Sequence, residues 1–150
     1  MEIRKANSED IDLILENRME FISNVVKEGM PDGFKDNTYK YLCEHIDDNS
    51  LAAWLAIDNE KIVSIAVICF YDVLPTVSNI SGKTGYILNV YTMENYRRKG
   101  LAKRLLTELI NEAKALNVGK ICLKATDDGR KVYEKMGFEI LTREMELKIN

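Results

Sequence analysis

Four basic side chains surround one glycine between positions 97 and 103, between a strand-like stretch and a long helical pattern. The segment consists of Arg97, Arg98, Lys99, Gly100, Leu101, Ala102 and Lys103. The first turn of a helix presents backbone N–H groups without partners and about half a unit of positive charge, and a phosphate or pyrophosphate satisfies both. Because Gly100 has no Cβ, an oxygen can approach the backbone closely. The segment therefore predicts a pyrophosphate site.

Two other interpretations of this basic segment are open. Taken alone, it is also compatible with a solvated charged run ahead of an ordinary helix. A nucleic-acid contact fits less well, because the run is short and the chain has a formal net charge of −3. The pattern is neither a Walker loop nor a dinucleotide fingerprint, since neither GxxxxGK followed by Ser or Thr nor GxGxxG is present.

The elements around the segment follow from periodicity. A strand over Gly85–Tyr91 precedes it, and an apolar stripe at helical spacing follows it. The stripe consists of Leu101, Ala102, Leu105, Leu106, Leu109, Ile110, Ala113 and Leu116. Asn117–Gly119 end this helix, and Lys120–Thr126 has the composition of a further strand. A short helix near Asp128–Met136 and a last strand over Phe138–Lys148 complete the chain.

The first half of the chain supplies the remaining elements. We expect a short strand over Ile3–Ala6 and then a helix from the cap Asn7 to about Lys27. A second helix runs from near 36–38 to Asp48. Strands over Leu51–Ile57 and Ile62–Tyr71 flank a polar turn and form an antiparallel hairpin.

These elements give the order β-α-α-β-β-β-α-β-α-β, which is a mixed α/β fold in one domain, 1–150. With 46% hydrophobic and 30% charged residues, the composition is that of a globular protein. Three cysteines without CxxC spacing argue against a disulfide framework or a metal site. The charged N-terminal residues and the short apolar runs lead us to expect a cytoplasmic protein without a signal peptide or membrane span.

Two short motifs resemble the GNAT superfamily of acetyltransferases. The first is Arg/Gln-x-x-Gly-x-Gly/Ala at a strand-to-helix turn, which here is Arg97-Arg98-Lys99-Gly100-Leu101-Ala102. The second, about thirty residues on, is Tyr-x-x-x-Gly-Phe, which here is Tyr133-Glu134-Lys135-Met136-Gly137-Phe138. The order of predicted elements is similar to the family over essentially the whole chain.

The resemblance implies a cofactor, acetyl-coenzyme A (acetyl-CoA), and a mostly antiparallel sheet with one splayed parallel pair. The pantetheine arm would enter between Tyr86–Tyr91 and Lys120–Thr126 and pair with the backbone of Leu88, Asn89 and Val90. The N–H of Val90 would polarise the thioester carbonyl, as an oxyanion hole does. Backbone amides from Arg98 to Lys103 would hold the pyrophosphate, with Arg97 beside them.

The resemblance also assigns Tyr133 as the general acid that protonates the departing thiolate, and as a cofactor contact. A tyrosine pKa of about 10 against about 8.5 for a thiol makes it a serviceable donor only when it is held against the sulfur. The alternative is that Tyr133 is a packing residue of the last helix. The general base is open between Glu94, Asp72 and a water held by Asn89, and a water-relayed path is our default.

Asp127 stands where many relatives carry an asparagine before the last helix. We consider two roles for it, a contact to the cofactor and a simple cap of that helix, and favour the cap. The turn before Arg97 also lacks the proline that is common there, because Thr92-Met93-Glu94-Asn95 fills it.

The acceptor site should form from the loop 27–36, the second predicted helix and the loop 72–83, the segments that vary most in the family. The acids of these loops would suit a cationic amine, although solvated surface acids are the commoner case; they are Glu28, Asp32, Asp36 and Asp72. The tyrosines there could line an apolar wall or belong to the core; they are Tyr39, Tyr41 and Tyr71. His45 is expected to be a surface or packing residue, and Cys69 and Cys122 to be core residues rather than acyl carriers.

The sequence thus predicts an N-acetyltransferase that moves an acetyl group from acetyl-CoA to a primary amine by direct attack, without a metal. The acceptor is a small molecule or a peptide amine. A non-catalytic acetyl-CoA-binding sensor or interaction domain of the same fold is the alternative. We expect no nucleic-acid or membrane partner, and an edge strand near either terminus leads us to expect a homodimer.

Overall fold

The computed structural model describes residues 1–141 and 143–150 of the chain. Its elements, in chain order, are β1 (Glu2–Lys5), η1 (Ser8–Asp10), α1 (Ile11–Val25), α2 (Phe34–His45), β2 (Leu51–Asp58), β3 (Lys61–Asp72), β4 (Lys83–Thr92), η2 (Glu94–Tyr96), α3 (Leu101–Ala115), β5 (Lys120–Leu123) and α4 (Asp127–Lys135).

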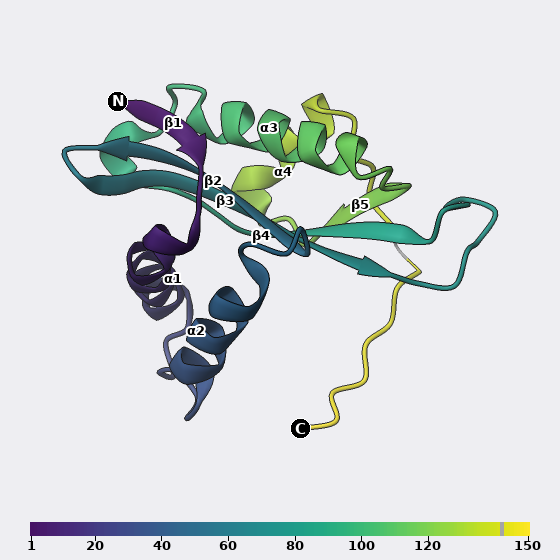
Figure 1. The fold of residues 1–150 in the computed structure, drawn as a ribbon, viewed down its shortest axis with the longest axis horizontal. Coiled ribbons are helices and arrows are strands. Elements are labelled where there is room, and N and C mark those ends of the chain that lie inside the picture. Colours follow the sequence, from purple (N-terminus) through teal and green to yellow (C-terminus); the bar gives the residue numbers. More distant parts are fainter. Residues whose placement is uncertain (142) are drawn as a thin grey trace.

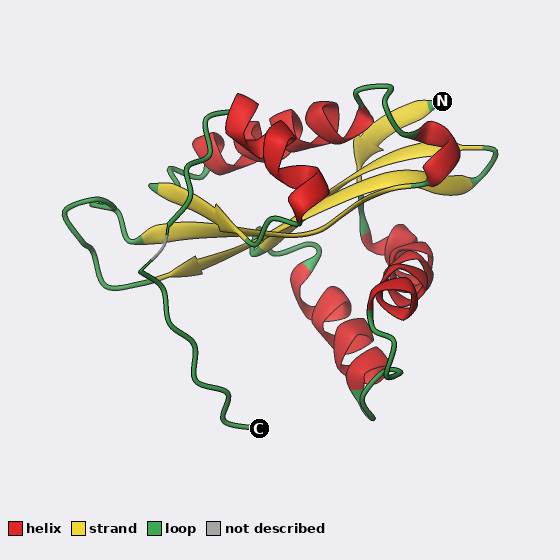
Figure 2. Cartoon of the chain, turned by 180° about the vertical axis from the view of Figure 1, so that it is seen from behind, coloured by secondary structure: helices red, strands yellow, loops and turns green. Residues whose placement is uncertain are grey.

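The five strands form one sheet in the order β1-β2-β3-β4-β5. Neighbours from β1 to β4 are antiparallel, and β5 alone runs parallel to its neighbour, β4. Helices α3 and α4 lie on one face of this sheet, and α1 and α2 lie on the other (Figures 1 and 2). The predicted mixed α/β class with one parallel pair is confirmed.

Alternating side chains of the central strands build two cores, one on each face. Leu55 and Ile65 pack towards α1 and α2 and are fully buried. On the other face, Ala52 and Ala66 lie under Leu105 of α3. These small side chains leave room for α3 to pack closely on the strands, so the helix that begins at Gly100 has a fixed position.

Polar contacts also hold α3 to the sheet. Trp54 of β2 donates its indole N–H to Glu112 of α3 over 3.3 Å. Lys5 of β1 forms an ion pair with the same carboxylate at 3.0 Å. Leu106 and Leu109 of α3 are fully buried, and each stabilises the fold by roughly 1.5–3 kcal/mol.

The final predicted strand, Phe138–Lys148, is wrong for the residues that the structure describes there, and position 142 lies outside them. Met145, Leu147 and Ile149 alternate as in a strand, yet all three are more than 80% exposed. The residues described after Gly137, which has φ of 99°, form no strand and pair with no residue of β5, although Phe138, Ile140 and Leu141 line a cavity together with β5 side chains. Alternation alone does not make a strand when no neighbouring strand accepts its backbone groups.

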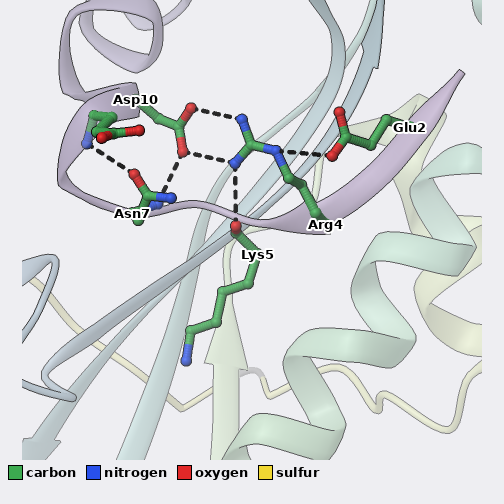
Figure 3. Close-up of polar contacts among 6 residues, drawn as sticks. Glu2, Arg4, Lys5, Asn7 and Asp10 are labelled. Atoms are coloured by element: carbon green, nitrogen blue, oxygen red, sulfur yellow. Dashed lines mark hydrogen bonds and ion pairs between the residues drawn. The ribbon is translucent and has the colours of Figure 1, made fainter.

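A compact polar cluster fixes the start of α1 (Figure 3). The guanidinium of Arg4 donates two hydrogen bonds, each of 2.8 Å, to the carboxylate of Asp10. The backbone N–H of Asn7 donates to the same carboxylate, and the Asn7 side chain accepts from the Glu9 N–H, which completes a capping box. Arg4 and, to a smaller extent, the Asn7 amide hold the pKa of the buried Asp10 carboxyl below its usual value.

Replacing Asp10 with Asn is expected to lower the free energy of unfolding by about 2 kcal/mol at pH 7, because the charge-assisted bonds to Arg4 are lost. The folded-state pKa is the depressed one, so this contribution is present above the unfolded pKa of about 3.9 and is lost as the pH falls through the folded value. Urea unfolding from pH 7 to pH 3 should therefore show the two proteins converging. Glu9→Gln removes the same charge from an exposed position and is the control. A difference in unfolding free energy between wild type and Asp10→Asn that does not change with pH would contradict the role of the carboxylate.

Candidate active site

A β-bulge interrupts β4 at Asn89 and Val90. The β3 partners of Leu88 and Tyr91 are two positions apart, whereas these two residues are three apart on β4. Asn89 and Val90 therefore have no partner residue on β3. Asn89 has φ of 53°, a left-handed conformation that asparagine tolerates better than a branched residue.

The bulge changes which way the side chains of β4 point. Leu88 and the next residue, Asn89, both line one cavity on the α1–α2 face. Val90 packs with the core on the opposite, α3 face, as Ile87 does. The bulge thus brings an amide side chain into the cavity in the middle of a strand.

The two parallel strands stay paired over only part of their length. Pairing between β4 and β5 covers Thr84 to Ile87, opposite Lys120 to Leu123, where β5 ends. β4 continues to Thr92, so its edge over 88–92 has no neighbouring strand in the described part of the chain. Its backbone groups on this side are open to an extended ligand. The splay expected between these strands is present, with β5 three residues shorter than predicted.

The N-terminus of α3 presents a row of free amides. The first N–H that has an acceptor at this end is that of Arg104, which bonds to the carbonyl of Gly100. Among the residues described, the amides over 98–103 donate no hydrogen bond. Gly100 has φ of 76°, and a Cβ at this position would meet no atom within 4 Å. The glycine is therefore not required for packing, and the space above it is open to an anion.

Several contacts fix the shape of the basic turn itself. Tyr96 donates its hydroxyl to Asp58 at the end of β2 over 2.8 Å. The Arg97 side chain donates to the Thr92 carbonyl over 2.9 Å, and the Lys99 ammonium lies 5.2 Å from the centre of the Tyr96 ring. Arg98 is exposed with φ of 62°. Arg97 and Lys99 therefore stabilise the turn, while the exposed Arg98 and Lys103 carry charge around the open amides.

Tyr133 lies on α4, and the contacts of its ring are those of a packing residue. Its ring is half-buried, packs edge-on against Phe138 at 5.8 Å, and contacts the α3-side core, as Val90 does. Its hydroxyl makes no hydrogen bond to any residue that the structure describes. Burial raises the pKa of the Tyr133 phenol, so the hydroxyl keeps its proton at neutral pH.

The cap predicted for α4 is wrong by one residue. Thr126, not Asp127, is the cap, and its hydroxyl accepts a hydrogen bond from the Gly129 amide over 3.1 Å. Asp127 is the first helical residue and is exposed. An acid at this place interacts favourably with the helix dipole. Asp127 also lines a cavity of about 320 Å³ that includes Tyr133, so the two residues share one side of the splay.

A mainly apolar cavity lies on the opposite face of the sheet, between α1, α2 and the strands. Its volume is about 440 Å³, and it reaches Asn89 at the bulge. It is lined by Ile14, Arg18, Phe34, Asn37, Thr38, Tyr41, Leu42, Leu51, Val67, Cys69, Leu88 and Asn89. A concave, mainly apolar cavity with a few polar groups is typical of a small-molecule site.

The predicted acceptor segments are only partly those that form this cavity. The second helix contributes as expected, whereas the loop 72–83 lies at the far end of the β3–β4 hairpin and does not line it. The acids expected to attract a cation do not line it either; they are Glu28, Asp32, Asp36 and Asp72. All three tyrosines are exposed, and of the three only Tyr41 lines the cavity.

Sequence reasoning missed Arg18 of α1. Arg18 occupies the apolar stripe of this helix, four residues after Ile14 and four before Ile22. A basic residue at a core-facing position was the available signal, because charge is rarely placed there without a use. The Arg18 guanidinium donates to the Asn89 side-chain oxygen over 3.2 Å and lies 5.6 Å from the centre of the Phe34 ring.

The three candidates for the general base differ in position. Asp72 lies six residues along β3 from Ala66, which is about 20 Å at the rise of a strand. Glu94 is exposed in η2, beyond the end of β4. Of the three, only Asn89 lines the cavity, whose lining contains no carboxylate. Neither of the two candidate carboxylates therefore lines this cavity.

The remaining sequence candidates are His45 and two cysteines, of which Cys69 also lines the cavity. His45 ends α2, stacks on Tyr41 at 4.1 Å and bonds to the Ser50 hydroxyl at 2.6 Å. Cys69 and Cys122 are partly buried in β3 and β5. Within the described residues, no group of three or more His, Cys, Asp or Glu side chains is arranged to hold a metal ion. No helix in the described chain combines the length and apolar character needed to cross a membrane.

Comparisons with known proteins agree with this geometry. Residues 19–138 match the acetyltransferase (GNAT) family. A predicted acetyltransferase from Clostridium acetobutylicum, crystallised with acetyl-CoA, is 36% identical and superposes with a TM-score of 0.89 over 99% of this chain and 96% of that one. A GCN5-related N-acetyltransferase from Ralstonia eutropha is 23% identical, with a TM-score of 0.84 over 99% and 97% of the two chains, and shows the likeness of fold alone.

An L-ornithine N5-acetyltransferase of Arabidopsis thaliana, NATA1, is 32% identical over 85 residues, which are 54% of this chain. The match spans 37% of that protein's length, so the two are related over little more than a third of the plant protein. The fold, with its parallel β4–β5 pair and the open N-terminus of α3, is that of the acetyltransferase crystallised with acetyl-CoA. Because the family match covers most of the chain, the protein belongs to the GNAT family of acetyltransferases.

The left-handed conformation of Asn89 makes a prediction about stability. Asn89→Gly and Asn89→Val both remove the side-chain amide, but only valine is strained at φ of 53°. We expect the valine variant to be less stable than the glycine variant by about 1–2 kcal/mol in urea unfolding. The same pair of changes at the neighbouring Leu88 is the control, where valine should be the more stable because it suits a strand. Equal stability of the two variants at position 89 would contradict the bulge.

Proposed function

We propose that the protein transfers an acetyl group from acetyl-CoA to a primary amine of a small molecule by direct attack. The observation that carries this proposal is the edge of β4 over 88–92, which runs on past the end of β5 and contains the bulge. Acetyl-CoA supplies the acetyl group as an activated thioester. In the transfer the amine loses a proton and forms an N–C bond as the C–S bond breaks, and the sulfur takes up a proton.

Binding of acetyl-CoA is assigned to two sets of backbone groups. The free amides over 98–103 hold the pyrophosphate, with the charges of Arg98 and Lys103 beside them. The open edge of β4 at Leu88, Asn89 and Val90 pairs with the pantetheine arm as an added strand. The residues fit this ligand because the amides have no other acceptor in the described structure and the space at Gly100 is open.

Two groups act on the reacting atoms in this proposal. The backbone N–H of Val90, which has no partner residue on β3 because of the bulge, stabilises the negative charge that develops on the thioester oxygen. Tyr133 donates the proton to the sulfur. Its raised pKa keeps the phenol protonated but makes it a weaker acid, so its contribution depends on position rather than on acidity.

The acceptor amine enters from the α1–α2 face, through the cavity that ends at Asn89. Its volume of about 440 Å³ suits a small molecule. The plant relative is named for acetylating L-ornithine, which is also a small-molecule amine. The amine proton leaves to a water in the cavity, because no carboxylate lines it. The homodimer and the cytoplasmic location expected from the sequence stay predictions.

A non-catalytic sensor that binds acetyl-CoA remains the alternative function. The open amides of α3 serve both functions equally. The enzyme is favoured by the cavity on the far face, because it brings a second ligand to the same bulge. Turnover with any amine separates the two.

Gly100→Glu is expected to weaken acetyl-CoA binding by at least about 100-fold, because the side chain places a negative charge at the proposed pyrophosphate position. Isothermal titration calorimetry measures it directly. Gly29→Glu is the matched control, since Gly29 also has a positive φ, of 86°, open space around its Cβ position and no place in the cavity lining. Equal affinity of both variants for acetyl-CoA would place the cofactor elsewhere.

Tyr133→Phe should lower kcat about 10- to 1,000-fold while leaving the dissociation constant of acetyl-CoA within about threefold, because it removes only the proton donor. The change retains the ring contact with Phe138, so the fold should persist. Stopped or continuous detection of the released thiol gives the rate. Tyr39→Phe, an exposed tyrosine of α2, serves as the control. An unchanged kcat in the Tyr133 variant would leave this residue with a packing role only.

A further inference from the structure

Arg18 brings a positive charge into a cavity that is otherwise mainly apolar. Its guanidinium contacts the Phe34 ring and the Asn89 side-chain oxygen, and both of these groups are uncharged. None of the ion pairs formed by the described residues involves Arg18. Burial lowers the pKa of this guanidinium, yet arginine stays charged at neutral pH. A partly buried cation without a carboxylate is costly, so its charge is available to an anion.

A second unused donor lies beside Arg18. Because a guanidinium only donates, the Asn89 oxygen must be the atom that faces it, and the amide nitrogen points elsewhere. That nitrogen is buried without an acceptor, in a residue that is only 8% exposed. Buried polar groups are nearly always paired, so an orphan donor in the wall of a cavity indicates a missing acceptor. The Arg18 guanidinium and the Asn89 amide nitrogen thus form a polar corner of the cavity, in which the cation has no anionic partner and the nitrogen has no acceptor.

The rest of the lining sets what the ligand carries besides the anion. Phe34, Leu42 and Val67 are representative of the apolar walls, and acidic side chains are absent from the lining. We infer that the acceptor is an α-amino acid with an apolar side chain, whose carboxylate binds Arg18 and the Asn89 amide. This inference rests on the proposed acetyl transfer and names the substrate class for it. Such a ligand matches the corner with its carboxylate and the walls with its side chain.

The charge of this corner favours a carboxylate over a phosphate. One planar guanidinium can bind two oxygens of either group side by side, so this geometry does not separate the two. A phosphate dianion carries more charge and more acceptors than one arginine and one amide satisfy, and the lining contains no second cation.

The position of the corner also explains why the reacting amine is the α-amine. Asn89 belongs to the bulge whose neighbouring amide, that of Val90, faces the thioester under the proposed function. In an α-amino acid, only one carbon separates the amine from the carboxylate. A carboxylate held at Arg18 and Asn89 therefore keeps the amine close to the bulge, and the side chain extends into the apolar part of the cavity.

The test compares amines that share one side chain and differ in the group that replaces or retains the carboxylate. L-Leucine, L-leucinamide and the aminophosphonic acid analogue of leucine are assayed with acetyl-CoA by thiol release, and L-methionine and L-phenylalanine with their amides likewise. We expect each amino acid to have a kcat/KM at least about 10-fold above its amide, as expected when a hydrogen-bonded charge pair is lost. A higher kcat/KM for the phosphonic analogue than for L-leucine would mean that the corner binds a phosphate-like group, and would overturn the assignment of a carboxylate.

Arg18→Met is the matched variant, because methionine retains an unbranched apolar chain without the charge. We expect the KM for L-leucine to rise about 10- to 100-fold, while the rate with L-leucinamide and the KM for acetyl-CoA stay within about threefold. Lys40→Met removes the same charge from the exposed side of α2 and should change neither value. Arg18→Lys should give an intermediate KM, since it keeps the charge without the planar fork.

Each outcome decides the inference separately from the proposed function. If acetyl-CoA binds and amides are acetylated as well as amino acids, or no amino acid in the panel is acetylated, the inference is wrong and acetyl transfer stands. If acetyl-CoA itself does not bind in calorimetry, the proposed function fails first. Equal effects of Arg18→Met on L-leucine and L-leucinamide would mean that Arg18 only packs.

Discussion

The arrangement of this site depends on one backbone conformation, the left-handed Asn89 in the middle of β4. It inserts one extra residue opposite Ala66, leaves Val90 without a partner residue on β3 and turns the Asn89 side chain into the α1–α2 cavity. Without the bulge, residue 89 would point to the α3 face. One irregular residue therefore sets both the open edge on one side and the polar corner on the other.

The sheet holds this irregularity in place because both of its faces are covered. Leu105 and Leu109 of α3 pack on one face, and Ile14 of α1 packs on the other, all of them almost fully buried. The Arg4–Asp10 cluster then fixes where α1 begins, and hence where Arg18 enters the cavity. The stability of the core and the position of the site are thus served by the same helices.

The sequence predicted the elements around the basic turn better than the cavity on the α1–α2 face. The start of α3 at Gly100 and the apolar stripe of this helix follow local rules, and both are confirmed. The bulge at Asn89 and the cavity at Arg18 depend on register and on contacts between distant elements, which periodicity does not contain. The prediction of a strand over Phe138–Lys148 was wrong for the same reason. An alternating pattern is local, whereas a strand also needs a neighbouring strand from elsewhere in the chain.

The contact between Trp54 and Glu112 has a practical consequence. Trp54 is the single tryptophan of the chain, it is partly buried under α3, and its indole donates to a helix that Lys5 also contacts. Intrinsic fluorescence therefore reports one particular event, the separation of α3 from the first two strands. A shift of its emission to longer wavelength marks solvent entering this interface, so a single optical channel follows detachment of the helix whose first turn is assigned to the pyrophosphate.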